Sequence, residues 1–123
     1  MAKKKIALII EDEKHIAEAE KIILQDRFEV HQAFDGETGL QIAKQIKPDI
    51  IVLDLMLPNR GGYEVCFSIR QIEEIKDTKI LMVTALNQQI DAEKGVLVGT
   101  DHYLTKPFEP DELLNAVDKV LKS

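Results

Sequence analysis

The residues that could do chemistry stand at the ends of short apolar runs. Glu11 and Asp12 follow one such run, Asp54 a second and Thr84 a third, while Lys106 ends a weaker strand-like segment. The carboxyl ends of parallel strands meet at one edge of a sheet, so we expect these side chains to converge. Two carboxylates ~4 Å apart repel by on the order of 4 kcal/mol at an effective dielectric of about 20. Positive charge must therefore stand among them.

Lys106 supplies one positive charge, and a hard divalent cation would supply the rest. Oxygen ligands from Asp12, Asp54 and a backbone carbonyl, completed by waters, suit Mg²⁺. A carboxylate beside such an ion, a hydroxyl and a lysine can attack phosphorus and form an aspartyl-phosphate. Asp54 is central in this set and is the expected nucleophile, with Lys106 pairing a phosphoryl oxygen and Thr84 offering its hydroxyl.

Two hydrophobic periodicities alternate along the chain. Continuous runs rich in β-branched residues predict buried strands at residues 6–10, 50–53 and 80–83. Weaker patterns predict edge strands at residues 28–33 and 101–105. Apolar residues at helical spacing predict helices near residues 16–24, 40–46, 65–72 and 113–121, and less clearly within 86–98. The alternation predicts an α/β fold: a five-stranded parallel sheet in the flavodoxin-like order 2-1-3-4-5, (βα)5, with helices on both faces.

Composition bounds the function. The 123 residues are 45% hydrophobic and 31% charged, which predicts one globular domain over residues 1–123. No apolar run is long enough to span a membrane or serve as a signal peptide, so we expect a cytoplasmic location. The net charge of −6 offers no basic footprint for nucleic acid. Cys66, the only cysteine, is expected to be a packing residue.

The ordered motifs resemble those of one family over essentially the whole chain. These motifs are EDE at 11–13, DLMLP at 54–58 followed by GG at 61–62, TA at 84–85 and YLTKPF at 103–108. Each is weak alone, but the set with these intervals is specific. The chain resembles the receiver domain of two-component response regulators, a phosphorylation-controlled signalling switch rather than an enzyme acting on a separate substrate.

The resemblance implies roles for individual residues. Asp54 matches the phosphoacceptor, which takes a phosphoryl group from a sensor histidine kinase or a histidine phosphotransfer protein. Glu11 and Asp12 match the acidic pair of a Mg²⁺ site, which Mn²⁺ could also occupy. Asp54 also matches a metal ligand, and Met56 matches the position that offers its backbone carbonyl to the metal.

The phosphoryl-binding and switch positions follow in the same way. Thr84, with Ala85 beside it, and Lys106 match the residues that engage the phosphoryl group. Tyr103 matches the aromatic residue whose rotamer reports the activated state. The resemblance implies that phosphorylation changes the surface of the fourth helix, fifth strand and fifth helix, which then controls an effector or output domain. A monomer or a phosphorylation-dependent dimer is expected.

Two prolines match structural positions. Pro58, with Gly61 and Gly62, shapes the loop after the third strand, and the peptide bond before Pro107 is usually cis in this family. Leu86 flanks the phosphoryl site, where a bulky apolar side chain could slow loss of the phosphoryl group.

Other interpretations remain open. Glu11 and Asp12 could simply cap the first helix, because carboxylates suit its positive end. Tyr103 could be ordinary packing. A magnesium-dependent phosphatase or mutase also works through an aspartyl-phosphate, but usually carries an aspartate where Met56 stands. A pseudo-receiver would keep the fold as an interaction module without phosphorylation.

Overall fold

Strands and helices alternate along the chain in the computed structural model, which describes residues 3–58, 60–85 and 90–123. The elements are β1 Lys5–Ile10, α1 Lys14–Leu24, β2 Phe28–Ala33, α2 Gly36–Ile46, β3 Ile50–Asp54, α3 Gly62–Arg70, β4 Lys79–Ala85, α4 Ala92–Val98, β5 His102–Lys106 and α5 Pro110–Lys122. The alternation predicted from hydrophobic periodicity is confirmed. β5 begins and ends one residue later than predicted.

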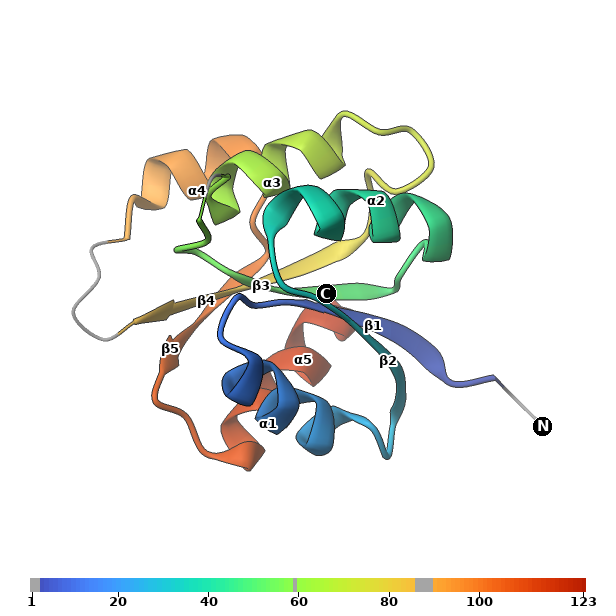
Figure 1. The fold of residues 1–123 in the computed structure, drawn as a ribbon. Helices are drawn as coiled ribbons and strands as arrows, with labels where there is room; N and C mark the ends of the chain where they lie inside the picture. Colours follow the sequence, from blue (N-terminus) through green and yellow to red (C-terminus); the bar gives the residue numbers. More distant parts are fainter. Residues whose placement is uncertain (1–2, 59, 86–89) are drawn as a thin grey trace.

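The five strands form a parallel sheet in the order β2-β1-β3-β4-β5, as predicted. Figure 1 shows the strands running side by side, with their carboxyl ends on the side away from the N-terminus. The register places Ile10 opposite Leu53, and Asp54 opposite Val83. The residues that follow β1, end β3 and end β4 therefore lie at one edge of the sheet.

Helices cover both faces of the sheet: α2, α3 and α4 on one side, α1 and α5 on the other (Figure 1). Alternate residues of β1 enter the two cores, with Leu8 and Ile10 in the first and Ala7 and Ile9 in the second. Both faces of the central strands are buried, which explains why their sequences read as continuous apolar runs. Burying each such Leu or Ile stabilises the fold by roughly 1.5–3 kcal/mol.

Helix caps set where the segments around the sheet edge begin. The Asp35 side chain accepts a hydrogen bond of 2.7 Å from the Thr38 N–H and starts α2. At α5, Glu109 and Glu112 form a reciprocal capping box around Pro110 at the first helical turn. These caps fix the directions of the chain after β2 and after β5.

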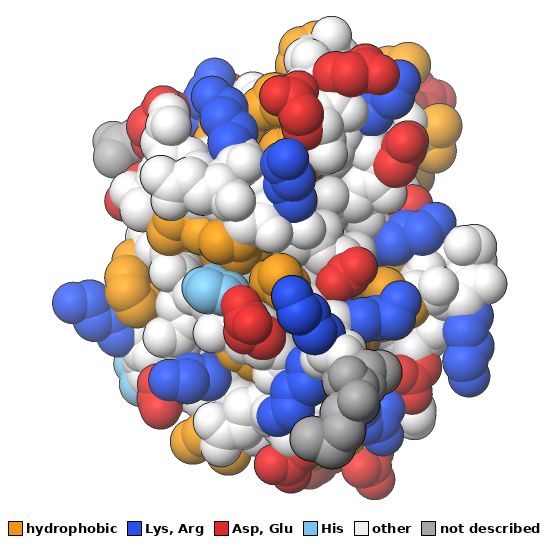
Figure 2. Space-filling view, turned by 90° about the vertical axis from the view of Figure 1, so that its right-hand side faces the viewer, with side chains coloured by type: hydrophobic (Ala, Val, Ile, Leu, Met, Phe, Trp, Pro, Cys, Tyr) orange, Lys and Arg blue, Asp and Glu red, His pale blue; other side chains and the backbone are white. Residues whose placement is uncertain are grey.

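The opposite, amino-terminal edge of the sheet has a mixed surface. Figure 2 shows Lys, Arg, Asp and Glu side chains interspersed there with small hydrophobic areas. Within the described ranges, no helix combines the length and the apolar character needed to cross a membrane. Cys66 is fully buried in the core beneath α2, α3 and α4.

Candidate functional site

Four predicted site residues meet at the carboxyl edge of the sheet: Glu11, Asp12, Asp54 and Lys106, hereafter the acidic edge. Glu11 directly follows β1, and its N–H donates a 3.0 Å hydrogen bond to the Ala33 carbonyl at the end of β2. Asp54 is the last residue of β3 and Lys106 the last of β5. The backbone of the sheet thus holds three of these residues, and Asp12 stands in the turn that leads to α1.

The side chains of the acidic edge are close enough to act together. Glu11, Asp12 and Asp54 each offer a carboxylate oxygen within 4.8 Å of the others. Lys106 Nζ donates to Glu11 Oε1 at 2.7 Å and lies 3.8 Å from Asp54 Oδ2. Glu11 and Asp54 are buried, whereas Asp12 is exposed. The arrangement is therefore a half-buried acidic cluster that opens to solvent.

Negative charge outweighs positive charge at this edge. Burial raises the pKa of Asp54 to about 7, and the neighbouring Glu11 charge adds to the rise. Lys106 and the N–H of Met56 oppose the rise, the latter through a 3.2 Å hydrogen bond to Asp54 Oδ1. Burial by itself would lower the pKa of Lys106, but the hydrogen bond to Glu11 and the nearby carboxylates raise it overall. The lysine is thus a firmly held cation.

Three further predicted residues border this edge. The Thr84 hydroxyl is buried at the end of β4 and has no hydrogen-bond partner among the described residues. Ala85 lies opposite Lys106 in the β4–β5 register. The Met56 side chain is 69% exposed while its N–H binds Asp54, so its backbone lies beside the carboxylate and its side chain points to water.

These features recur in one family. Residues 7–118 match the response regulator receiver domain. The chain belongs to this family. The resemblance inferred from the ordered motifs is thereby confirmed.

The receiver domain has curated relatives that are transcriptional regulators. It is 43% identical over 116 residues to the DNA-binding dual master transcriptional regulator RpaA of Synechocystis sp., covering 94% of this chain and 48% of that protein. It is 44% identical over 108 residues to the transcriptional regulatory protein DltR of Streptococcus agalactiae, covering 87% of this chain and 47% of that protein. The chain thus spans about half the length of these relatives.

Solved receiver structures share the fold. The chemotaxis response regulator CheY4 of Vibrio cholerae superposes with a TM-score of 0.89 at 31% identity, covering 95% of this chain and 98% of that chain. The receiver domain of the sensor histidine kinase PA1611 from Pseudomonas aeruginosa gives a TM-score of 0.87 at 27% identity, covering 98% and 99% of the two chains. That structure has a magnesium ion coordinated in its active site cleft.

The loop after β3 depends on a close backbone approach. A Cβ on Gly62 would lie 2.7 Å from the Asp54 carbonyl oxygen, whereas one on Gly61 would meet the Leu55 carbonyl oxygen at an ordinary 3.8 Å. The Gly62 N–H also donates to the Leu55 carbonyl at 2.9 Å. Of the two glycines singled out in the sequence, Gly62 is therefore the one whose lack of a side chain lets α3 begin beside Asp54.

The remaining predicted residues are placed as follows. Pro58 lies in this loop with an exposed side chain, and the peptide bond before Pro107 is cis, as the resemblance implied. Leu86, the residue predicted to influence loss of the phosphoryl group, lies outside the described residues. Asn59, which follows Pro58, is likewise outside them.

Tyr103 lies away from the acidic edge, on the side of the sheet that carries α3 and α4. Its ring packs against the core there, and its hydroxyl is 3.1 Å from the Tyr63 hydroxyl on α3. A Cβ on Gly95 of α4 would overlap the Tyr103 hydroxyl. Burial and the Tyr63 hydrogen bond raise the pKa of Tyr103. The Tyr103 ring is thus held inward by the contact with the Tyr63 hydroxyl and by the space that Gly95 leaves because it has no side chain.

Sequence reasoning missed Glu20 and Tyr63. Of the apolar residues at helical spacing in α1, at positions 16, 19, 23 and 24, Leu24 is fully buried as expected, but the other fully buried positions of the helix are Ala17 and Glu20. A glutamate three residues after Ala17 and four before Leu24 was a detectable signal, because it falls on their helical face. No such signal exists for Tyr63, whose role depends on a contact 40 residues away in the chain.

Proposed function

We propose that Asp54 accepts a phosphoryl group from a phosphohistidine of a sensor histidine kinase or phosphotransfer protein. One observation supports this most directly. The Asp54 carboxylate ends β3 with its oxygens beside those of Glu11 and Asp12 and 3.8 Å from the Lys106 ammonium. A nucleophile there has a fixed cation on one side and a carboxylate pair suited to a second cation on the other.

The proposed step balances simply. An Asp54 carboxylate oxygen attacks phosphorus, the phosphorus–nitrogen bond to the imidazole breaks, and the electron pair of that bond leaves with the nitrogen. The product is a mixed anhydride between Asp54 and phosphate. Lys106 pairs one phosphoryl oxygen as a point charge, and the Thr84 hydroxyl, which has no hydrogen-bond partner within the described part of the chain, donates a hydrogen bond to another. Ala85 lies beside them, opposite Lys106 in the sheet.

The donor set fits Mg²⁺, with Mn²⁺ as a substitute. Carboxylate oxygens of Glu11, Asp12 and Asp54 lie within 4.8 Å of one another, and hard oxygen donors are what these ions take. Asp12, the exposed member, and Asp54 would be the more direct ligands, with the Met56 carbonyl beside them. When bound, the ion supplies positive charge that favours the ionised carboxylates and offsets the charge of the incoming phosphoryl oxygens.

Phosphorylation would act as a population shift. Thr84 would move to bond the new phosphoryl group, and Tyr103 would change its packing in response. The surface of α4, β5 and α5 carries the exposed apolar side chains Val96 and Leu97, which are 79% and 83% exposed. We infer that this surface meets an effector or output domain or, after phosphorylation, a second copy of the domain. Direct nucleic-acid binding by this domain is not expected from its net charge of −6.

The relatives suggest what the output is. RpaA and DltR carry transcriptional functions in their names, and this chain covers about half of each. We infer that a receiver of this kind controls transcription through a separate output domain, in the cytoplasm. The enzyme alternative, a phosphatase or mutase, has no second aspartate at the Met56 position to act as general acid.

The test is intact mass after incubation with acetyl phosphate and Mg²⁺. The wild type should gain one phosphoryl group that hydroxylamine removes, because acyl phosphates are labile to it. Asp54→Asn should gain none. Asp77→Asn, which changes an exposed aspartate after α3, is the matched control and should behave as the wild type.

Other outcomes separate the alternatives. If the folded wild type gains no mass, the interaction-module interpretation replaces the phosphoacceptor. If Asp54→Asn is still phosphorylated, the nucleophile is another residue. Uptake that does not depend on Mg²⁺ would remove the proposed role of Glu11 and Asp12.

A further inference from the structure

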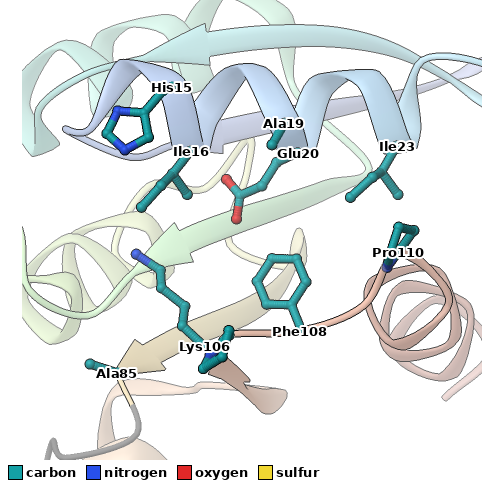
Figure 3. A pocket seen from close by; sticks show the side chains of 10 residues that line it. His15, Ile16, Ala19, Glu20, Ile23, Ala85, Lys106, Phe108 and Pro110 are labelled. Carbon is teal, nitrogen blue, oxygen red and sulfur yellow. The ribbon is translucent and has the colours of Figure 1, made fainter.

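A pocket of about 650 Å³ lies between α1 and the segment that joins β5 to α5. Figure 3 shows its walls: Ile16, Ala19 and Ile23 project from α1, facing Phe108 and Pro110. Three of the apolar residues at helical spacing in α1 therefore line this pocket, while Leu24 lies in the core. Its volume falls within the range of small-molecule sites, about 300–1,000 Å³.

One buried carboxyl group lies among the apolar walls of this pocket. Glu20 is 1% exposed, and neither of its carboxylate oxygens has a hydrogen-bond partner among the described residues. In Figure 3 the carboxylate is directed into the space between Lys106 and Phe108. Burial raises the pKa of Glu20 to about 8, the charges of Glu11 and Asp54 add to the rise, and Lys106 opposes it. Buried polar groups are nearly always hydrogen-bonded, so this carboxylate calls for a partner.

The cationic groups that border the pocket are engaged elsewhere. Lys106 donates its 2.7 Å hydrogen bond to Glu11 and lies 3.8 Å from Asp54, both in the acidic edge. His15 is exposed at the rim, with its Nε2 3.5 Å from a Glu13 oxygen. Within the described residues, Glu20 is thus the acceptor that lacks a donor.

The chemistry of the pocket narrows the class of ligand. A single carboxylate among aliphatic and aromatic walls lacks the six or more oxygens that Mg²⁺ or Ca²⁺ takes. An anion would meet the Glu20 carboxylate. A planar amidinium or guanidinium group carries paired N–H donors that match both carboxylate oxygens, and its charge favours the ionised carboxylate. An apolar body on that cation would cover the Ile16, Ile23 and Phe108 surfaces.

We propose that the α1–α5 pocket binds a small organic cation, an amidinium or guanidinium on an aromatic or branched apolar body, with Glu20 as its anionic acceptor. The pocket shares Lys106 with the acidic edge, but its acceptor is Glu20, and binding does not depend on phosphorylation of Asp54. The Glu20 oxygens are covered in this structure, so the proposal requires a side chain of the pocket wall to turn aside; the half-buried Phe108 ring, which borders the space in front of the carboxylate in Figure 3, is the side chain we assign to this movement.

The test compares benzamidinium with benzamide, its neutral counterpart of the same shape, by methyl NMR of the full chain with excess Mg²⁺. Benzamidinium should shift the methyl signals of Ile16 and Ile23 saturably and bind at least about tenfold more tightly than benzamide. Glu20→Gln keeps the side-chain shape and removes the charge, and it should abolish this preference. Glu18→Gln, an exposed glutamate on the same helix, is the matched control and should retain it.

A second variant guards against a folding artefact. Ala19→Leu places a larger side chain at the pocket wall and leaves Glu20 in place, so it should weaken binding of both compounds. The proposal is overturned if benzamide binds as tightly as benzamidinium, or if the preference for the cation survives Glu20→Gln. Amide spectra recorded on the same samples give a further outcome: shifts confined to the amides of Glu11, Asp12 and Asp54 would also overturn the proposal, because the cation would then occupy the acidic edge.

Discussion

The acidic edge and the α1–α5 pocket bury carboxylates on two sides of the same lysine. In the acidic edge, Glu11 accepts a 2.7 Å hydrogen bond from Lys106, and Asp54 accepts one from the Met56 N–H. In the pocket, Glu20 has neither kind of partner among the described residues. These carboxyl groups are similarly buried, so they differ in their hydrogen-bond partners and not in their burial.

The consequence appears in the protonation of the two groups. Burial and neighbouring negative charge raise the pKa of both, that of Asp54 to about 7 and that of Glu20 to about 8. Asp54 can therefore ionise near neutral pH, as a nucleophile must, and added positive charge at the acidic edge would favour it further. Glu20 stays protonated at neutral pH unless a cation reaches it. The Lys106 charge acts on both groups, so their difference lies in hydrogen bonding: Asp54 accepts a hydrogen bond from the Met56 N–H, whereas Glu20 has none among the described residues.

The largest expected effect comes from removing the shared lysine. Lys106→Met leaves the buried Glu11 carboxylate without its ammonium partner and should lower the free energy of unfolding by about 3 kcal/mol at pH 8 in EDTA. Because the folded pKa of Lys106 is raised, its stabilising charge is present throughout pH 5 to 8. The loss should be smaller at pH 5, where Asp54 is protonated. Urea unfolding at the two pH values measures it.

An equal loss at pH 5 and pH 8 would show that the charge of Asp54 adds nothing to the loss, and would leave the Lys106–Glu11 pair and the packing of the lysine stem as its causes. In that case Lys106 would support both regions in the same way, and the comparison between them would fail.

The next largest expected effect comes from replacing Glu20, which should raise the free energy of unfolding rather than lower it. Folding raises its pKa from 4.5 to about 8, so the folded state holds an extra proton between these values. The free energy of unfolding therefore falls as pH rises through this window, by up to about 1.4 kcal/mol per pH unit from this group. Glu20→Gln lacks this decline. Its free energy of unfolding should equal that of the wild type near pH 5 and exceed it by roughly 2–4 kcal/mol at pH 8.

Urea unfolding from pH 5 to 9 in EDTA checks this, with Glu18→Gln as a control whose curve should run parallel to that of the wild type. The wild-type curve also contains a contribution from Asp54, whose pKa is raised to about 7. If Glu20→Gln declines with pH as steeply as the wild type, then Asp54 causes the whole slope and Glu20 has an unseen partner.

These two regions also show what the sequence could predict. Asp54 and Thr84 follow continuous apolar runs, so their strand ends and their shared edge follow from hydrophobic pattern and parallel topology. Glu20 could not be placed in this way. Helical periodicity locates a buried face from the apolar residues alone. Ile16 and Ile23 are apolar but line the pocket, so the pattern indicated the wrong face of α1 as buried. The rotation of α1 is set by packing against β2 and α5, which one helix does not encode.

Tyr103 gives a third, intermediate case: a half-buried hydroxyl whose partner is another hydroxyl. Gly95→Ala places a methyl group where the Tyr103 hydroxyl lies, so the ring should leave and the 3.1 Å contact with Tyr63 should break. The expected cost is about 1–2 kcal/mol of unfolding free energy. Since the chain has two tyrosines and no tryptophan, near-ultraviolet circular dichroism reports these rings directly.

The control for Gly95→Ala is the same substitution in the Tyr103→Phe background, which removes the hydroxyl that clashes. The cost should fall there by about half or more. An undiminished cost would place the strain within α4 itself, and Gly95 would then have no part in holding Tyr103 inward.

The smallest effect tests whether burial sets the strength of an ion pair such as that of Lys106 with Glu11. Arg27 and Asp118 join the start of β2 to α5 through two hydrogen bonds of 3.0 and 3.1 Å, with side chains 52% and 39% exposed. Arg27→Gln should cost less than about 1 kcal/mol and less again in high salt, because water screens exposed pairs. Urea unfolding at low and high salt, with Asp118→Asn and the double variant, isolates the pair. This pair makes two hydrogen bonds where Lys106 and Glu11 make one shorter bond of 2.7 Å, so both pairs are within hydrogen-bond distance. If removing the Arg27–Asp118 pair lowered the free energy of unfolding as much as Lys106→Met does, hydrogen-bond geometry rather than burial would set the strength of both pairs. Burial would then give Glu20, which has no hydrogen-bond partner among the described residues, no stronger attraction for a cation than an exposed glutamate has.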